Sequence, residues 1–520
     1  MKKYLKFLPL LALGFVSCEP ELDNPIDEAG FYNNGEADFS NYVALGNSLS
    51  AGYADGALYI SGQENSFPNI MAQQFSLVQE TGAFAQPLMA DNAGGLLMGG
   101  TQIADNRRVL AVGASGPSPQ IYTGMTPTTD ITNVLSGSFN NMGVPGAKSF
   151  HLLAPGYGDI AGVSVGTANP YFVRFASSTQ TSILADAVAQ NPSFFSLMAG
   201  ENDVLSYATS GGTGVDQTGN LDVTTYGSND ITDPMVFASV YSQIVTAMVG
   251  TGAGGVLTSI PDVTTIPYFT TIPNNALELD AAKAASLTGF FQAVAGIFAQ
   301  GAIQQGVDPA VAQGLAAQYA LAFSAGPNRF LIDVPVTQTN PLGFRQMTEQ
   351  ELLVLTINRQ DLAQGYGSVV LTPEVMQVLG LLQQGGQPSA EQAQLVLDAV
   401  SGIDDKDVLD NQEIQAIAVA TTSYNATIKA LAQANGLAFA DVNAFLTQVA
   451  NGGVPYDAGT LTSVFVTGEA FSLDGVHPTP RGYAAIANLI LDAVNQTYSS
   501  TVPKVNVGNY RTVTLSNDVQ

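Results

Sequence analysis

The stretch Tyr42-Val43-Ala44-Leu45-Gly46 is a short apolar run that ends in glycine and leads into Asn47-Ser48. Such a run is typical of a buried strand that ends in a tight turn. Further runs of this kind lie at 194–198, 255–260 and 437–442. Helical spacing of apolar residues lies between and after the runs, most clearly over 479–498. Strands separated by helices predict an α/β fold with a mostly parallel sheet.

The composition of the whole chain excludes several classes of protein. Apolar residues make up 46% of the 520 residues and charged residues 11%, so the chain can bury a large core and is not a disordered polyelectrolyte. The formal net charge is −27, and no cluster of Lys and Arg stands out. Because such a surface repels phosphate backbones, we expect no nucleic-acid partner.

The first residues have the pattern of a targeting segment. A basic start precedes the apolar run 7–16, which is too short to span a bilayer. The run ends in Phe15-Val16-Ser17-Cys18, which resembles the lipobox of bacterial lipoproteins. The resemblance implies that residues 1–17 are a signal peptide and that lipidated Cys18 anchors the chain to a bacterial membrane. An ordinary signal peptide or an incidental buried cysteine is the alternative.

The anchor implies an extracytoplasmic protein, at the outer membrane or the cell surface. Cys18 is the only cysteine, so no disulfide can form within the chain. Residues 18–40 are acidic and contain Pro, Gly and Asn. We therefore expect them to form a tether between the anchor and the folded domain.

Histidine occurs only at His151 and His477. His477 lies in Asp474-Gly475-Val476-His477-Pro478, just before the last helical pattern. An acid three residues before a histidine can curl back to hold the imidazole Nδ1–H, which leaves Nε2 free to act as a base. A surface turn is the alternative interpretation of this motif.

Ser48 is the candidate nucleophile for that base. It follows the first predicted strand, and open parallel sheets bind ligands outside the carboxyl ends of their strands. A helix N-cap is the alternative role for this serine. Two more turns can supply hydrogen-bond donors: Gly146 closes the tight turn 141–146 and can present a backbone N–H, and Asn202 follows the run 194–198 with a side-chain amide.

These segments, in this order, resemble the four sequence blocks of the SGNH hydrolase superfamily, the GDSL-like lipases and esterases. Gly46-Asn47-Ser48-Leu49 resembles the nucleophile block, with Asn47 in place of the usual aspartate. Gly146 matches the glycine of the second block, and Gly200-Glu201-Asn202-Asp203 matches the third. Asp474 and His477 match the fourth. The resemblance covers about residues 40–270 and 435–500.

The resemblance implies a three-layer α/β/α, flavodoxin-like fold with about five parallel strands, in a domain of residues 41–500. It implies an esterase or lipase that cleaves esters of lipids or carbohydrates through Ser48, His477 and Asp474, by way of an acyl-enzyme. The backbone N–H groups of Ser48 and Gly146 and the amide of Asn202 would form the oxyanion hole. No metal or organic cofactor is implied.

The segment from about 270 to 435 is rich in Ala and Gln, with helical spacing over 287–298 and 311–323. No charge occurs between Lys283 and Asp308, so a membrane span is one interpretation. Interrupting glutamines and glycines favour a packed helical hairpin. Because simple SGNH members are shorter, the resemblance makes 275–430 a helical insertion or cap, which can shape an acyl or glycan pocket. Residues 501–520 form a C-terminal extension.

Other motifs and functions compete with this interpretation. Gly162-Val163-Ser164-Val165-Gly166 matches the G-x-S-x-G motif of α/β-hydrolases but lacks a strong preceding strand. Gly146-Ala147-Lys148-Ser149 lacks the glycine that precedes the lysine of a phosphate-binding loop. For His151 we expect a structural hydrogen bond.

Three rival functions fit some of these residues. An acyltransferase would use the same triad as an esterase. A non-catalytic, glycan-binding surface lipoprotein would be expected to lose Ser48, Asn202 or His477, and all three are present. A metal hydrolase would need several carboxylates around its histidines, and none is suitably spaced.

Overall fold

The computed structural model describes residues 30–113 and 116–515. A five-stranded sheet with the order β18-β9-β8-β1-β7 lies at its centre, and all neighbouring strands are parallel. Ranked by their place in the chain, these strands have the order 2-1-3-4-5. The chain is therefore an α/β protein with a parallel sheet, as predicted. The strands are β1 (Tyr42–Gly46), β7 (Asn141–Gly143), β8 (Phe194–Met198), β9 (Gly254–Thr258) and β18 (Ala438–Ala440).

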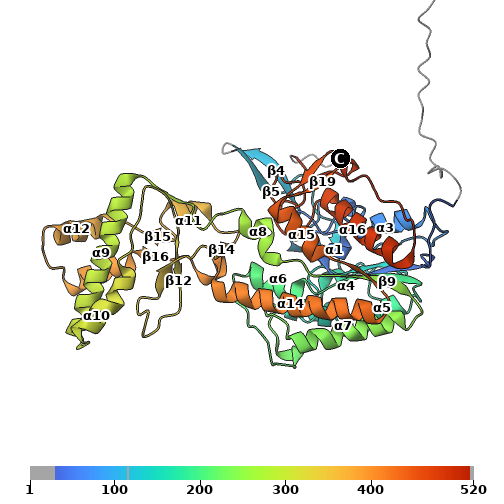
Figure 1. Ribbon diagram of the computed structural model, residues 1–520, viewed down its shortest axis with the longest axis horizontal. Coiled ribbons are helices and arrows are strands. Elements are labelled where there is room, and N and C mark those ends of the chain that lie inside the picture. The colour runs from blue at the N-terminus through green and yellow to red at the C-terminus, as the bar shows by residue number, and fades with distance from the viewer. Residues whose placement is uncertain (1–29, 114–115, 516–520) are drawn as a thin grey trace, which may run out of the picture.

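Helices cover both faces of the sheet (Figure 1). On one face α16 packs on β9 and β18 and against α3, and on the other α14 packs on the same strands and against α7. Because both faces are covered, the strands are apolar on both sides instead of alternating. The helices are α3 (Phe67–Phe75), α7 (Pro234–Val249), α14 (Asn411–Ala434) and α16 (Pro480–Tyr498).

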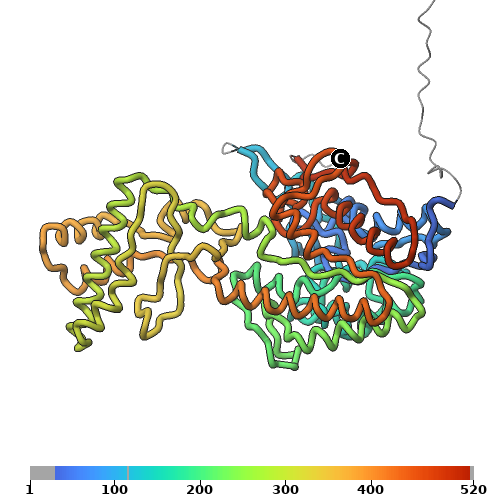
Figure 2. The backbone as a smooth tube through the Cα atoms, viewed as in Figure 1, coloured from blue at the N-terminus to red at the C-terminus, as the bar shows by residue number. Residues whose placement is uncertain are grey.

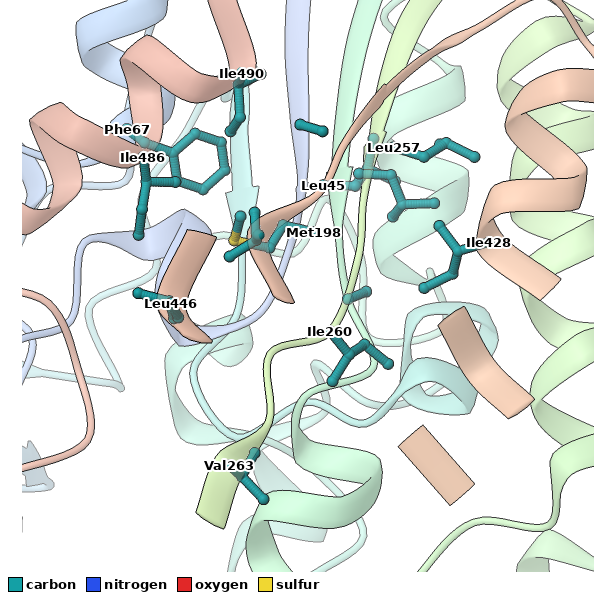
Figure 3. Close-up of a cluster of buried hydrophobic side chains, with 14 of the residues drawn as sticks. Leu45, Phe67, Met198, Leu257, Ile260, Val263, Ile428, Leu446, Ile486 and Ile490 are labelled. Carbon is teal, nitrogen blue, oxygen red and sulfur yellow. The ribbon is translucent and has the colours of Figure 1, made fainter. Parts of the chain in front are cut away.

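The core fills the space between sheet and helices. Figure 3 shows Ile486 and Ile490 of α16 on one side of the strands and Ile428 of α14 on the other, with Leu45 and Leu257 between them. All five of these side chains are at most 1% exposed. Burial of such a side chain contributes about 1.5–3 kcal/mol each to folding. The core thus fixes the strands whose ends carry the predicted site.

Most predicted elements of the part of the fold that contains the five-stranded sheet, the sheet lobe, are confirmed. The runs 42–46 and 194–198 are β1 and β8, and the runs beginning at 255 and 437 overlap β9 and β18. Thr479 caps α16 through the N–H of Gly482. The prediction was wrong for residues 141–143, which we expected to be part of the tight turn 141–146. These residues form edge strand β7, because Met142 is buried beside Leu45 and the turn begins only at Val144.

Residues between α8 (Pro267–Thr270) and α14 form a second lobe beside the sheet (Figures 1 and 2). This inserted lobe has its own apolar cluster, which includes Phe290, Phe291 and Tyr319. Its helices are α9 (Ala281–Gln304), α10 (Pro309–Ala316), α11 (Arg359–Ala363), α12 (Pro373–Gln383) and α13 (Ala390–Asp398). Its paired strands are β10 (Leu277–Leu279) with β11 (Gly326–Asn328), β12 (Leu331–Asp333) with β13 (Phe344–Gln346), β14 (Leu352–Leu353) with β17 (Val408–Leu409), and β15 (Ser368–Val369) with β16 (Val400–Ser401).

The predicted helical hairpin is present as α9 packed against α10. Its second helix ends at Ala316, short of the expected residue 323, and a 3-10 turn follows. Within 30–113 and 116–515, α9 is the one helix long and apolar enough to cross a membrane, and its Phe290–Phe291 side is buried in the cluster of the lobe. Of the predicted insertion, residues 411–430 lie in α14, which covers the sheet.

The signal peptide, Cys18 and residues 18–29 of the expected tether lie outside the described residues. Residues 30–40, also expected in the tether, contact the sheet lobe. The N–H of Glu36 donates to Tyr498 O at 2.7 Å, and the N–H of Asn33 donates to Thr501 Oγ1 at 2.8 Å. Phe39 is fully buried and stacks on Phe75. This part of the chain therefore belongs to the folded lobe.

Candidate active site

Three loops with predicted site residues leave neighbouring strands at the same edge of the sheet. Gly46, the last residue of β1, pairs with Met198 of β8 and with the last residue of β7. Ser48, Asn202 and Gly146 follow these three strand ends by two to four residues. The order of the strands reverses between β1 and β8, which is where open α/β sheets bind ligands.

A tight turn presents Ser48 at the start of α1 (Ser48–Ala51). A side chain at Gly46 would place its Cβ 2.2 Å from Met198 O, so this position requires glycine. The Oδ1 of Asn47 accepts a hydrogen bond from Leu49 N at 3.0 Å and caps the helix. The predicted cap role thus belongs to Asn47, and the hydroxyl of Ser48 is available for another contact.

His477 links Ser48 to Asp474. Its Nε2 lies 2.9 Å from Ser48 Oγ, and its Nδ1 lies 2.8 Å from Asp474 Oδ2. The side chains of His477 and Asp474 are 13% and 9% exposed. The fold therefore joins three predicted residues in one chain of hydrogen bonds, with Ser48 and His477 429 positions apart. These distances suit transfer of a proton from the hydroxyl to the imidazole.

The carboxylate of Asp474 is held from several sides. Its Oδ1 accepts from the N–H groups of Val476 and His477, each at 2.8 Å, and its Oδ2 accepts from the N–H of Gly56 at 2.9 Å. Burial alone would raise the pKa of Asp474, but the charge of His477 and these hydrogen bonds lower it well below its ordinary value. The group is therefore an ionised acceptor that orients the imidazole.

The turn at residues 55–56, which the sequence analysis missed, supports the Asp474 loop. Asp55 accepts from the N–H of Leu473 at 3.0 Å, and its own N–H donates to Ser472 Oγ at 2.8 Å. Ser472 Oγ donates in turn to Asp474 Oδ1 at 3.1 Å. The two segments are more than 400 positions apart and share no motif. Only the fold reveals that they form one network.

The predicted oxyanion donors lie on adjacent loops. The amide of Asn202 is buried and donates to Ala147 O at 2.9 Å, which ties the loop after β8 to the loop after β7. Gly146 has a φ of +80°, and its N–H and that of Ser48 have no hydrogen-bond acceptor among the described residues. These groups can donate to a developing oxyanion at this edge of the sheet.

The competing motifs lie apart from this network. Ser164 is exposed in a 3-10 helix of residues 160–165 and has no histidine as a hydrogen-bond partner. Lys148 is buried, and its Nζ donates to Asp230 O at 2.5 Å. His151 makes the structural hydrogen bond that we predicted: its Nδ1 accepts from Lys148 N at 3.1 Å, and its ring stacks on Tyr157.

His151 gives the stability of the fold a predictable dependence on pH. Burial, followed by the charge of Lys148, lowers the pKa of His151 to about 4. Between pH 6.5 and 4 the unfolded chain therefore binds more protons than the folded chain, so stability falls as the pH falls. We expect the Tm of the wild type to drop more between pH 7 and pH 4.5 than that of His151→Gln. Equal drops in thermal scans would contradict this prediction.

A groove of about 960 Å³ lies in the inserted lobe. It is lined by parts of β10, α9 and residues 359–376, and by no residue of the hydrogen-bond chain at Ser48. Helix α8 and the lobe both lie beside the histidine loop: Tyr268 N of α8 donates to Gly475 O at 2.9 Å, and a Cβ on Gly475 would lie 2.8 Å from Leu355 of the lobe. The lobe thus borders the candidate site, while its groove is separate from the triad.

No protein-family model, curated protein or solved structure matches this chain. The resemblance seen in the sequence therefore depends on four short motifs. The chemistry of the site depends on the contacts that these motifs make, above all on those between Ser48, His477 and Asp474.

Proposed function

We propose that the chain is a serine hydrolase of the SGNH, GDSL-like type that cleaves carboxylic esters. The observation that carries this proposal is the pair of hydrogen bonds from Ser48 Oγ to His477 and from His477 to Asp474, at 2.9 and 2.8 Å. Neither a surface turn at His477 nor a capping role for Ser48 would require these contacts. Their agreement with the order of the four motifs adds independent support.

In the proposed reaction, His477 Nε2 takes the proton of Ser48 Oγ while the oxygen attacks the ester carbonyl. Asp474 keeps the Nδ1–H of the ring in place and stabilises the imidazolium that forms. His477 then gives the proton to the departing alcohol, which leaves an acyl-enzyme on Ser48. A water molecule, deprotonated by the same ring, attacks the acyl carbonyl and releases the acid.

The negative charge on the carbonyl oxygen needs fixed donors during both attacks. The N–H groups of Ser48 and Gly146 and the side-chain amide of Asn202 are proposed for this role. Asn202 is buried and is held to Ala147 O, so its amide is positioned before the substrate arrives. Such preorganised donors stabilise the transition state more than donors that must first reorient.

The fold supports the family assignment. The strand order 2-1-3-4-5, which also occurs in flavodoxin-like folds, and the helices on both faces of the sheet support the three-layer fold that the resemblance implies. The inserted lobe follows β9, the fourth strand of the sheet in chain order, and lies in the sequence between the motif 200–203 and the motif 474–477. The position of its Leu355 beside Gly475 supports a role in shaping the acyl or glycan side of the substrate pocket.

We further propose that the enzyme is an extracytoplasmic lipoprotein anchored through Cys18, at the outer membrane or the cell surface. The support is the basic, apolar and lipobox-like pattern of residues 2–18. The substrates proposed are acyl esters of lipids or carbohydrates.

Fluorophosphonate labelling of the folded chain, followed by peptide mass spectrometry, tests the proposal. We expect one adduct, on the peptide that contains Ser48, and no adduct on heat-denatured protein, because only an activated serine reacts. A folded chain without an adduct, or with the adduct on Ser164, would contradict it. Ester panels with and without an alcohol acceptor then separate hydrolysis from acyl transfer.

A further inference from the structure

A buried carboxyl group that the proposed mechanism does not use lies behind the nucleophile turn. Glu201 is 3% exposed and precedes α6 (Asn202–Thr209). Its Oε2 accepts from the Asn47 amide, with Nδ2 at 2.5 Å, and Asn47 is fully buried. The other end of that amide, Oδ1, accepts from Leu49 N and caps the helix that begins at Ser48. One amide thus connects Glu201 to the nucleophile turn.

We propose that Glu201 is a positioning residue that fixes the Ser48 turn through Asn47. This inference rests on the proposed function, because it concerns the same serine. The contact has a direction: the Asn47 amide donates to Glu201 and accepts from Leu49. A carboxylate at position 47 has no hydrogen to donate, so it could keep only the second contact. The pair therefore requires one donor and one acceptor.

The surroundings of Glu201 make this contact sensitive to charge. Burial raises the pKa of Glu201 to about 7, against hydrogen bonds from its own backbone and from Asn47 that lower it, and the charge of Asp203 raises it further. Burial, followed by the charge of Glu201, raises the pKa of Tyr241 of α7 well above its ordinary value. Glu201 Oε1 and the Tyr241 hydroxyl are buried without a hydrogen-bond partner in the described part of the chain. Among residues 30–113 and 116–515, Asn47 therefore supplies the one side-chain hydrogen bond that the Glu201 carboxyl receives.

An acid at position 47 would bring two carboxyl groups together in a buried place. Two such groups share one proton, so one pKa rises strongly. The folded N47D variant then holds a proton that the unfolded chain releases, and its stability falls as the pH rises. Adding E201Q to N47D restores the pair with reversed polarity, because the introduced amide can donate to the introduced carboxylate. The structure therefore predicts the direction of each effect: N47D loses stability as the pH rises, and adding E201Q restores the hydrogen bond.

The test compares four full-length proteins: wild type, N47D, E201Q and N47D/E201Q. The readouts are the rate constant for fluorophosphonate reaction at Ser48, at pH 6 and pH 8, and the Tm. We expect E201Q to react within about threefold of wild type, since it keeps an acceptor. N47D should react about 100-fold more slowly at pH 8, the cost of a misplaced reactive group, and less slowly at pH 6. The double variant should recover to within about tenfold of wild type.

Glu413 offers a matched control, because burial also raises its pKa to about 7 and it lies on α14, in a capping box with Asp410. E413Q should leave the reaction rate unchanged and should not rescue N47D. Wild-type reactivity of N47D at pH 8 would overturn the inference, as would a double variant that folds but stays as slow as N47D.

Two further outcomes are decided by other readouts. If N47D does not fold, the E201M variant tests the inference, since methionine is similar in size to glutamate and lacks the carboxyl oxygens that accept from Asn47. A slower reaction of about tenfold or more supports the positioning role, and an unchanged rate overturns it. If the wild type itself does not react, the proposed function fails. Coupling between the two substitutions in Tm would then still show whether residues 47 and 201 act as a pair.

Discussion

Replacement of Ser48 by alanine is expected to lower kcat for ester hydrolysis by about 10⁶-fold. The variant has no oxygen that can form the acyl-enzyme, although the donors around the carbonyl remain. Among the described residues the hydroxyl of Ser48 makes one hydrogen bond, to His477, so the capped turn should survive and the Tm should change little. Turnover of a short-chain nitrophenyl ester, measured with thermal unfolding of the same samples, checks both expectations.

The matched control for this loss is Ser164→Ala, which removes the serine of the competing G-x-S-x-G motif. Ser164 is exposed in a 3-10 helix, so its replacement should leave both turnover and Tm unchanged. If Ser48→Ala keeps turnover and Ser164→Ala loses it, the nucleophile has been assigned to the wrong serine. If both variants keep turnover, the chemistry does not pass through either residue.

Asp474→Asn should reduce kcat by about 10⁴-fold, a loss typical of this change in a serine–histidine–acid triad. An amide NH₂ facing His477 Nδ1 forces the proton onto Nε2, the nitrogen that lies 2.9 Å from Ser48 Oγ. The ring then donates to the serine instead of accepting its proton. The change would also set an amide against the Gly56 N–H, which now donates to Oδ2. A moderate loss of Tm should therefore accompany the loss of turnover.

Asp91→Asn is the control for Asp474→Asn, because it places an amide in another buried loop and so shows how much Tm such a change costs without an effect on catalysis. Asp91 is 9% exposed and accepts from the N–H groups of Ala93 and Thr128, away from the hydrogen-bond chain of Ser48. We expect it to lower the Tm without lowering kcat. An Asp474→Asn variant that folds and retains more than a tenth of wild-type kcat would remove Asp474 from the triad.

The sequence was sufficient where a local pattern determines the structure. The buried strands 42–46 and 194–198 and the capped helix from Pro480 follow from apolar runs and from turn and cap residues, which act over a few positions. The hydrogen bonds of His477 could be predicted equally well, because Asp474 is three residues away and Ser48 follows the end of strand β1 by two residues. Motif order and strand ends together indicated which distant residues meet.

Features that depend on distant pairs were not predictable from one sequence. Strand β7 is three residues long, and only its pairing with β1 distinguishes it from a turn. The contact between Gly56 and Asp474 joins segments 418 positions apart, and that between Asn47 and Glu201 joins segments 154 apart. Glu201 stood in a recognised motif, but no local rule assigns it a partner. The short strand pairs of the inserted lobe were not predictable for the same reason, because each strand is recognised only by its pairing with another.

The N-terminal segment joins the fold at the edge of the sheet opposite to Ser48. Residues 33–36 lie against Tyr498 and Thr501, and Tyr498 also contacts Phe194 and Gly255 at the starts of β8 and β9. The chain thus enters the fold at the amino edge of the sheet, while Ser48 lies beyond the carboxyl edge. A protein tethered through Cys18 would hold its reactive edge and inserted lobe toward the surroundings. The lipids of its own bilayer would then lie behind the enzyme, which favours esters that arrive from outside, such as acylated carbohydrates.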